Sequence, residues 1–179
     1  MILGTDQIHK RICEEKLIEN LSKRELENPE SVVIDLRIKK AFRLEGTAFL
    51  GVEERETPRA VLISEFNPHK KTELILKPGE YVLTETIEKF NMPRDLFCII
   101  KPRATLHRMG VISRQSIVDP GFSGTIHPAL YNAGTITVTI EMGARYVQVF
   151  FIEIKGGVSA YRGQWQGGRS TTEGREKQV

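Results

Sequence analysis

Lys101-Pro-Arg-Ala-Thr-Leu-His-Arg-Met-Gly110 is followed closely by Ser116-Ile-Val-Asp-Pro-Gly-Phe-Ser-Gly124, and these two stretches are the most informative part of the chain. The first places guanidinium and hydroxyl groups in a turn bounded by proline and glycine. The second sets one carboxylate, Asp119, in a Pro-Gly turn after an apolar run. Guanidinium groups grip phosphate oxygens in a forked geometry that lysine cannot copy, and a carboxylate beside bound phosphates can orient a water or a sugar hydroxyl. Together the two stretches indicate a nucleotide phosphate site.

Short apolar runs separated by turn signals lie on both sides of these stretches. Strand-like runs occupy residues 31–38, 40–50, 59–65, 74–84 with an internal Pro-Gly turn, 97–100, 110–112, 116–118, 124–132, 135–141 and 145–154. Many short strands at this spacing predict an all-β barrel or sandwich. Residues 5–15 predict a short helix capped by Thr5 or Asp6, and the charged segment that follows, with Asn28-Pro29, predicts a loop.

Composition divides the chain into two parts. Residues 1–155 predict one β-barrel domain with the short helix at its start. From Gly156 onward Gly, Ser, Thr, Arg and Gln dominate, so residues 156–179 predict a flexible C-terminal arm. The 179 residues, of which 40% are hydrophobic and 27% charged, are enough for one compact domain with a real core.

Charge and cysteine content argue against several functional classes. A net charge of only +3, without a basic stripe interleaved with aromatic residues, argues against nucleic-acid binding. There is no apolar run long enough for a membrane span and no signal-peptide core, so no membrane partner and a cytoplasmic location are expected. Cys13 and Cys98 are expected to be buried free thiols, and no Cys/His spacing indicates a metal site made by protein ligands.

Five motifs, met in order, resemble those of the dUTPase and dCTP deaminase superfamily over nearly the whole chain. They are Val33-Ile-Asp-Leu-Arg37, Leu76-Lys-Pro-Gly-Glu-Tyr-Val-Leu83, Pro102-Arg-Ala-Thr-Leu-His-Arg-Met-Gly110, Ile117-Val-Asp-Pro-Gly-Phe-Ser-Gly124 and Gly143-Ala-Arg-Tyr-Val-Gln148. The tail, Tyr161-Arg-Gly-Gln-Trp-Gln-Gly167, resembles that of deaminases and archaeal dUTPases. The resemblance implies a distorted dUTPase-like β-barrel (a β-clip) that forms a homotrimer. It also implies active sites at subunit interfaces and an arm that closes over a pyrimidine deoxynucleoside triphosphate.

The resemblance further implies roles for individual side chains. Arg103, Thr105 and Arg108 would contact the triphosphate. Asp119 would be the catalytic residue that orients the sugar and the attacking water, and Phe122 would pack on the deoxyribose. Further substrate contacts are implied for Ala104, Thr125, His127, Gln148, Tyr161, Arg162, Gln166 and Arg169. Mg²⁺ is the expected cofactor, held mainly through the substrate's phosphates.

Ala104 and Ala129 depart from the family's pattern. Both branches usually carry serine where Ala104 stands. Deaminases carry a glutamate where Ala129 stands, and that carboxylate shuttles protons while water attacks C4 of cytosine. The dUTPases carry an apolar residue there, so Ala129 predicts that deamination is absent. His127 could replace the glutamate only if Pro128 does not distort the strand.

The leading prediction is therefore a dUTP diphosphatase that converts dUTP and water to dUMP and pyrophosphate, by Asp119-oriented attack on the α-phosphate. The first alternative is a dCTP deaminase, with or without diphosphatase activity, which the chain length, the N-terminal helix and the tail favour. The second alternative is a catalytically impaired nucleotide-binding or regulatory homologue. Ala104, Ala129 and Gln164 keep that possibility open.

Overall fold

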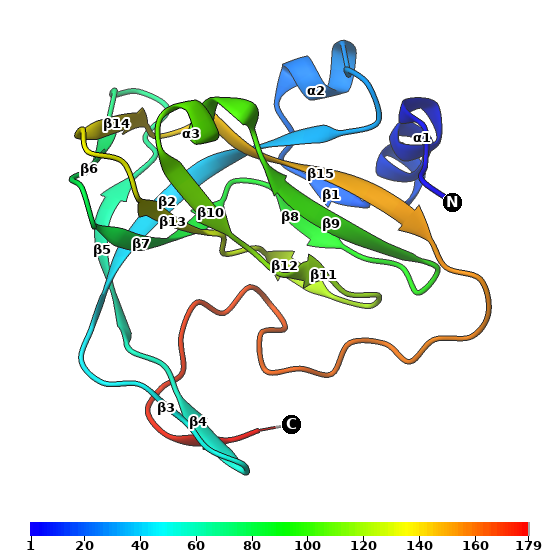
Figure 1. Cartoon of the computed structure of the whole chain (residues 1–179). Helices are drawn as coiled ribbons and strands as arrows, with labels where there is room; N and C mark the ends of the chain where they lie inside the picture. The colour runs from blue at the N-terminus through cyan, green and yellow to red at the C-terminus, as the bar shows by residue number, and fades with distance from the viewer. Residues whose placement is uncertain (179) are drawn as a thin grey trace.

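A computed structural model describes residues 1–178, and Figure 1 shows a curled sheet with the helices on one side and the C-terminal segment on the other. The helices are α1 (Thr5–Glu15), α2 (Lys23–Glu27) and α3 (Ala104–Arg108). The strands are β1 (Ile18–Glu19), β2 (Ile34–Glu45), β3 (Phe49–Leu50), β4 (Glu54–Glu56), β5 (Arg59–Glu65), β6 (Glu73–Leu76), β7 (Tyr81–Thr86), β8 (Lys89–Asn91), β9 (Leu96–Pro102), β10 (Val111–Arg114), β11 (Ile117–Val118), β12 (Ser123–Thr125), β13 (Ala129–Asn132), β14 (Val138–Glu141), β15 (Arg145–Glu153) and β16 (Glu176–Lys177). The last residue of the predicted arm, Val179, lies outside the described residues.

The main sheet has eight strands in the order β10-β13-β7-β2-β15-β9-β11, with β5 added to β2. All of its neighbouring strands run antiparallel. The two central strands, β2 and β15, bury alternate apolar side chains, namely Ile34, Leu36, Ile38, Val147, Val149 and Phe151. Register shifts in β2 and β15 increase the local twist of the sheet. The all-β prediction is confirmed, as a curled half-barrel with short helices.

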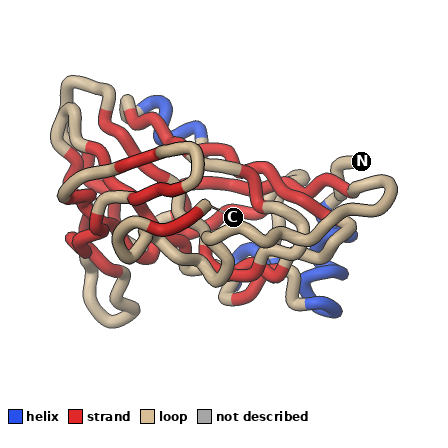
Figure 2. Tube along the Cα trace, turned by 90° about the horizontal axis from the view of Figure 1, so that it is seen from below, coloured by secondary structure: helices blue, strands red, loops and turns tan. Residues whose placement is uncertain are grey.

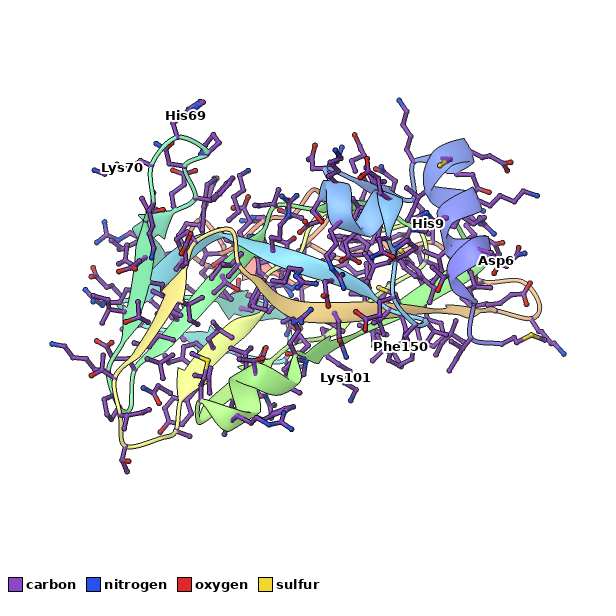
Figure 3. All side chains as sticks on the ribbon, turned by 90° about the horizontal axis from the view of Figure 1, so that it is seen from above. Asp6, His9, His69, Lys70, Lys101 and Phe150 are labelled. Carbon is purple, nitrogen blue, oxygen red and sulfur yellow. The ribbon has the colours of Figure 1, made fainter. Side chains whose placement is uncertain are left out.

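Figure 3 places the two ends of this half-barrel. His69 and Lys70 lie at the tip of the loop between β5 and β6, while Asp6 and His9 lie on α1 at the opposite end. Lys101 and Phe150 project from the neighbouring strands β9 and β15 between these ends. No helix in the described part of the chain is long and apolar enough to span a membrane.

Several local predictions need correction. Helix 5–15 has the predicted bounds, but Gly4 occupies its N-cap and no side chain caps it. Ile8 and Ile12 fill the buried face of α1, so Cys13 is exposed and only Cys98 is the buried thiol. The segment predicted as a loop contains β1 and α2, and Ser22 caps α2 by accepting a hydrogen bond from the Glu25 amide.

The strands on either side of the Pro78-Gly79 turn do not form a hairpin with each other. The first of them, β6, pairs with β14, while β7 pairs with β2 and β13. The turn instead leads the chain from a two-stranded sheet into the main sheet. The Gly79 amide donates to the carbonyl of Asn132, which fixes the turn against the end of β13.

The run predicted at 124–132 is divided into two strands that belong to different sheets. β12 joins a three-stranded sheet with β8 and β1, and β13 joins the main sheet. The crossing occurs at residues 126–128, where Pro128 has no amide hydrogen for a ladder. His127 therefore lies at the point where the chain passes from one sheet to the other.

Residues 156–178 run back beneath the half-barrel and end on a hairpin formed by β3 and β4 (Figure 1). Figure 2, seen from below, shows this segment crossing the underside of the strands. Its last strand, β16, pairs with β4. The arm is therefore held at its far end by the hairpin as well as by the barrel.

Candidate functional site

A cavity of about 360 Å³ opens between the underside of the barrel and the arm. We call it the arm-covered cavity. The barrel contributes Asp119, Phe122, Thr125, Ile126, His127 and Pro128 among its walls, and the arm contributes Tyr161, Trp165, Arg169, Ser170 and Thr171. Both the Pro-Gly turn and the crossing at residues 126–128 thus open into one space.

The turn that carries Asp119 is closed by a hydrogen bond from the Phe122 amide to the Asp119 carbonyl. Gly121 adopts a positive φ of 80°, which side chains rarely adopt. A Cβ at Gly121 would also meet Ala160 of the arm at 2.7 Å. The Asp-Pro-Gly sequence is therefore suited both to the turn and to the passage of the arm across it.

The arm is attached to this turn by main-chain and side-chain bonds. The Tyr161 amide donates to Pro120 and the Gly167 amide donates to Ser123. Gln166 bonds the Ser123 amide and the Gly121 carbonyl. The rings of Phe122 and Tyr161 meet edge to face with centroids 5.7 Å apart. Phe122 is thereby enclosed as a wall of the cavity.

Residues 126–128 line the cavity, and the main-chain groups of His127 are left out of the hydrogen-bond ladder there. The carbonyls of Ile126 and Pro128 accept hydrogen bonds from Thr86 and Thr84 of β7. In an antiparallel pair the intervening residue points its amide and carbonyl the other way, so those of His127 are not used by this ladder. Such groups can read the edge of a flat base by hydrogen bonding.

The imidazole of His127 is almost enclosed. Its Nε2 atom is buried without a hydrogen-bond partner among the described residues, and it lies 3.9 Å from Oε2 of Glu85 on β7. Burial chiefly, and Lys40 secondarily, lower the pKa of His127, while Glu85 opposes the shift. The ring is therefore held in its neutral form near pH 7.

A second cavity, of about 400 Å³, lies beside α2 and the start of α3. We call it the arginine cavity. Arg103, Ala104, Thr105 and Gln148 line it together with Arg24, Glu25, Glu30, Ser31, Val33 and Asp35. It shares no residue with the arm-covered cavity. Figure 1 shows α2 and the arm on opposite sides of the sheet.

Carboxylates hold the guanidinium groups of the arginine cavity in place. Asp35 forms ion pairs with Arg103 and Arg145, the latter at 2.7 Å. The buried Glu25 pairs with Arg24 and accepts a hydrogen bond from the Asp35 amide at 3.2 Å. Burial, together with Arg145 and Arg24, lowers the pKa of Arg103. Arg103 is positioned for a phosphate oxygen, but its charge is already balanced by Asp35.

Some predicted site residues lie outside both cavities. Arg108 is the last residue of α3, lines neither cavity and donates to the Ala104 carbonyl at 3.2 Å. Arg162 is exposed. Gln166 binds the turn rather than the cavity. The substrate contacts predicted for these three residues stay predictions. They would require the side chains to move or a second protomer to bring the substrate to them.

Sequence reasoning missed most of the charged lining of the arginine cavity. Arg24 and Glu25 lie in a segment predicted as a loop, so nothing distinguished them from surface charges. Asp35 gave a signal, because it interrupts the apolar run of β2, where an unpaired charge is costly. Glu85 gave none, since an acidic residue on an alternating strand is ordinarily a solvated one.

Comparisons with known proteins identify the class to which this fold and site belong. A Pyrococcus furiosus protein named dCTP deaminase is 38% identical over 99 residues, covering 55% of this chain and 64% of that protein. A Pyrococcus abyssi protein of the same name is 33% identical over 132 residues, covering 73% of this chain and 86% of that protein. The crystal structure of 2'-deoxycytidine 5'-triphosphate deaminase from Agrobacterium tumefaciens superposes with a TM-score of 0.63 at 16% identity, covering 84% of this chain and 48% of that one.

The fold and the motifs are thus those of the dUTPase and dCTP deaminase superfamily, as predicted. Residues 2–154 match the model of the dCTP deaminase-like family, and the chain belongs to that family. It spans about half of the Agrobacterium chain and about two thirds of the Pyrococcus furiosus protein.

The prediction of a dUTP diphosphatase is wrong as the leading function. The curated relatives are named dCTP deaminase, some of them dUMP-forming, and this contradicts it. The error came from weighting one missing carboxylate, at Ala129, above features spread over the whole chain. The length of the chain, its N-terminal helix and its tail all favoured the deaminases.

Proposed function

We propose that this protein binds a pyrimidine deoxynucleoside triphosphate and converts dCTP and water to dUTP and ammonia. The observation that carries the proposal is the arm-covered cavity, with its base-sized space and the free main-chain groups of His127, in a chain of the dCTP deaminase-like family. Phe122 would pack on the deoxyribose, Asp119 would bind the sugar hydroxyl, and residues 125–128 would read the base.

The active site would be shared between protomers. Arg103 and Thr105, two of the three predicted phosphate ligands, line one cavity, whereas Asp119 and Phe122 line the other. One nucleotide can use both sets if the arginine cavity of one protomer abuts the arm-covered cavity of the next. A closed ring of identical contacts would provide this arrangement, and the proposed assembly is the homotrimer.

Mg²⁺ would enter with the nucleotide. In the arginine cavity each carboxylate already accepts a bond from a guanidinium group, so no protein ligand set stands free for a cation. The three carboxylates Glu25, Glu30 and Asp35 also balance the charges of Arg24, Arg103 and Arg145. A triphosphate would therefore need added positive charge, which Mg²⁺ bound to phosphate and water would supply.

A second candidate function is nucleotide binding without turnover, in a regulatory role. The observation that favours it is Ala129, which is buried on β13 and offers no carboxylate. Ala104 removes a hydroxyl in the same way from the arginine cavity. Both cavities would still be able to bind a nucleotide.

Product analysis tests these proposals. Purified protein with Mg²⁺ is incubated with dCTP, and the nucleotides are separated by chromatography while ammonia is assayed. Equal amounts of dUTP and ammonia are expected, and dUMP would reveal a coupled diphosphatase step. Calorimetric binding of dCTP with no ammonia would reject deamination in favour of the second candidate.

A further inference from the structure

His127 lines the arm-covered cavity, and Glu85 of β7 lies next to its imidazole, 3.9 Å from Nε2. Ala129 lies opposite Leu83 in the β13–β7 ladder, so two residues earlier His127 lies opposite Glu85. Side chains two apart on a strand share a face, so His127 and Glu85 lie on the same face as Ala129. The bonds from Thr84 to Pro128 and from Thr86 to Ile126 show that Pro128 does not break this register.

Both members of the pair are poorly solvated. The side chains of His127 and Glu85 are only 11% and 12% exposed. Lys39 and Lys40 also lie next to Glu85, with their Nζ atoms 3.3 and 3.5 Å from its carboxylate oxygens. Glu85 therefore joins His127 to two lysine ammonium groups in one cluster of charged and titratable side chains.

The unpartnered Nε2 of His127 is directed at this carboxylate rather than at solvent. A proton on Nε2 is therefore favoured by Glu85, which leaves Nδ1 as the nitrogen able to meet a bound base. In other systems, too, an acidic side chain orients an imidazole and selects its tautomer.

We propose that His127, with Glu85 as its positioning residue, contacts the 4-position of the bound pyrimidine and carries the protons of the attacking water. The proposal rests on the proposed deamination and extends it to the residues that replace the missing carboxylate at Ala129. His127 is the catalytic residue in this account, and Glu85 acts only through it.

The water oxygen bonds to C4 of cytosine, and one water proton passes through His127 to N3. The second proton passes from the new hydroxyl through His127 to the amino nitrogen. The C4–N4 bond then breaks, ammonia leaves and uracil remains. No oxidant, reductant or further reactant is consumed.

Three variants separate the proposed roles. His127→Asn removes the titrating ring, Glu85→Gln removes the charge that orients it, and Glu65→Gln is the matched control. Glu65→Gln likewise removes a carboxylate oxygen that lies 3.9 Å from Lys40 Nζ, but the carboxylate beside His127 is that of Glu85. The charges that act on His127 are those of Glu85 and Lys40; Lys39 pairs with Glu85, and the same cavity is lined by the titratable or charged side chains of Asp119, Tyr161 and Arg169.

Turnover is the first measurement. His127→Asn should lower kcat for dCTP deamination by about 100-fold, the size typical of a lost general base, with a KM within about threefold of wild type. Glu85→Gln should move the acidic limb of the kcat/KM profile to lower pH by about half a unit to one unit, since a lost carboxylate no longer supports the imidazolium. Glu65→Gln should leave the limb in place.

Ring titration is the second measurement, and it does not depend on turnover. The Cε1 proton of His127 is identified by its loss in His127→Asn and followed by NMR from pH 5 to 9, with and without dTTP. The nucleotide should shift the apparent pKa of His127 and leave those of His9, His69 and His107 unchanged.

The outcomes are separable. If the wild type deaminates dCTP and His127→Asn has the same kcat, the proposed role of His127 and Glu85 is wrong, while the proposed function stands. Absence of deamination with a nucleotide-dependent His127 titration rejects the function and the proton transfer but supports the contact with the base. Absence of both rejects the two proposals together.

Discussion

At the scale of single residues, buried carboxylates are the feature with the clearest energetic consequence. Glu88 is fully buried and accepts bonds from the Nε and main-chain amide of Arg37, at 2.7 and 2.8 Å. Burial outweighs these bonds and raises the pKa of Glu88 above its ordinary value of 4.5. The folded protein thus binds a proton at Glu88 more readily than the unfolded chain does.

The sign of the resulting pH dependence follows from proton linkage. A raised folded-state pKa contributes stability that is fully present below pH 4.5 and is lost as the pH rises through the folded pKa. The unfolding free energy of wild type, relative to Glu88→Gln, should therefore fall over this window by about 1.4 kcal/mol per unit of pKa shift. Urea denaturation from pH 4 to 8 measures it, and a difference that grows with pH would contradict the assignment.

Arg103 supports a second prediction at this scale. Arg103→Ala should weaken nucleotide binding about tenfold to a hundredfold, because a charge-assisted contact of about 1.5–3 kcal/mol is lost. Arg94→Ala is the comparison, since Arg94 is exposed and lines neither cavity of the protomer. Calorimetry with dTTP measures both, and equal affinity for Arg103→Ala and wild type would remove Arg103 from the site.

At the scale of elements, the arm and the turn that it crosses depend on two glycines. A Cβ at Gly124 would lie 2.3 Å from the Gly168 amide nitrogen, and one at Gly168 would lie 2.5 Å from Thr125. The backbones of barrel and arm therefore approach as closely as they do only because neither position has a side chain.

Gly124→Ala should release the arm from the turn. Hydrogen exchange at the Tyr161 and Gly167 amides, which bond Pro120 and Ser123, should become faster by at least about tenfold. Gly46→Ala is the matched control, because Gly46 also has a positive φ but its Cβ would meet nothing within 4 Å. If Gly46→Ala raised the exchange rates of these amides as much as Gly124→Ala does, the effect would come from backbone strain at a positive φ. The close approach of the arm to the turn would then not be what holds the arm.

The sequence predicted the bounds of helices and strands better than it predicted which strands pair with each other. Strand 59–65 and helix 5–15 have the bounds that local patterns indicate, because propensity and periodicity act over neighbouring residues. The pairing of β6 with β14, across more than sixty residues, has no local signal. Asp119, which the Pro-Gly turn marked in the sequence, lines the arm-covered cavity, whereas Glu85 joined the site only through the register of β7 with residues 126–128.

At the scale of the whole molecule, the separation of the two cavities is the main feature. The resemblance to a family implied sites shared between subunits, and nothing in the sequence pattern alone could place Arg103 and Asp119 apart. In the protomer they line different cavities on different sides of the sheet. The assembly should therefore be necessary for tight binding.

Mixing two variants tests this requirement. Asp119→Ala and Arg103→Ala should each leave no tight site for dTTP when pure. After joint refolding in equal amounts, about a quarter of the sites should pair an intact Asp119 with an intact Arg103 from a neighbour. Titration calorimetry counts these sites. No recovery in a mixed oligomer confirmed by light scattering would show that both residues must belong to one protomer.

Trp165 is the sole tryptophan of the chain, and it lines the arm-covered cavity with the guanidinium of Arg55 4.5 Å from its ring centroid. The protein thus contains one tryptophan fluorophore, on the segment that would move and next to a cationic group that would stay with the β3–β4 hairpin. Departure of the arm would place the indole in water and red-shift its emission. Stopped-flow fluorescence could therefore time arm opening and closure in the unlabelled protein, before any product forms.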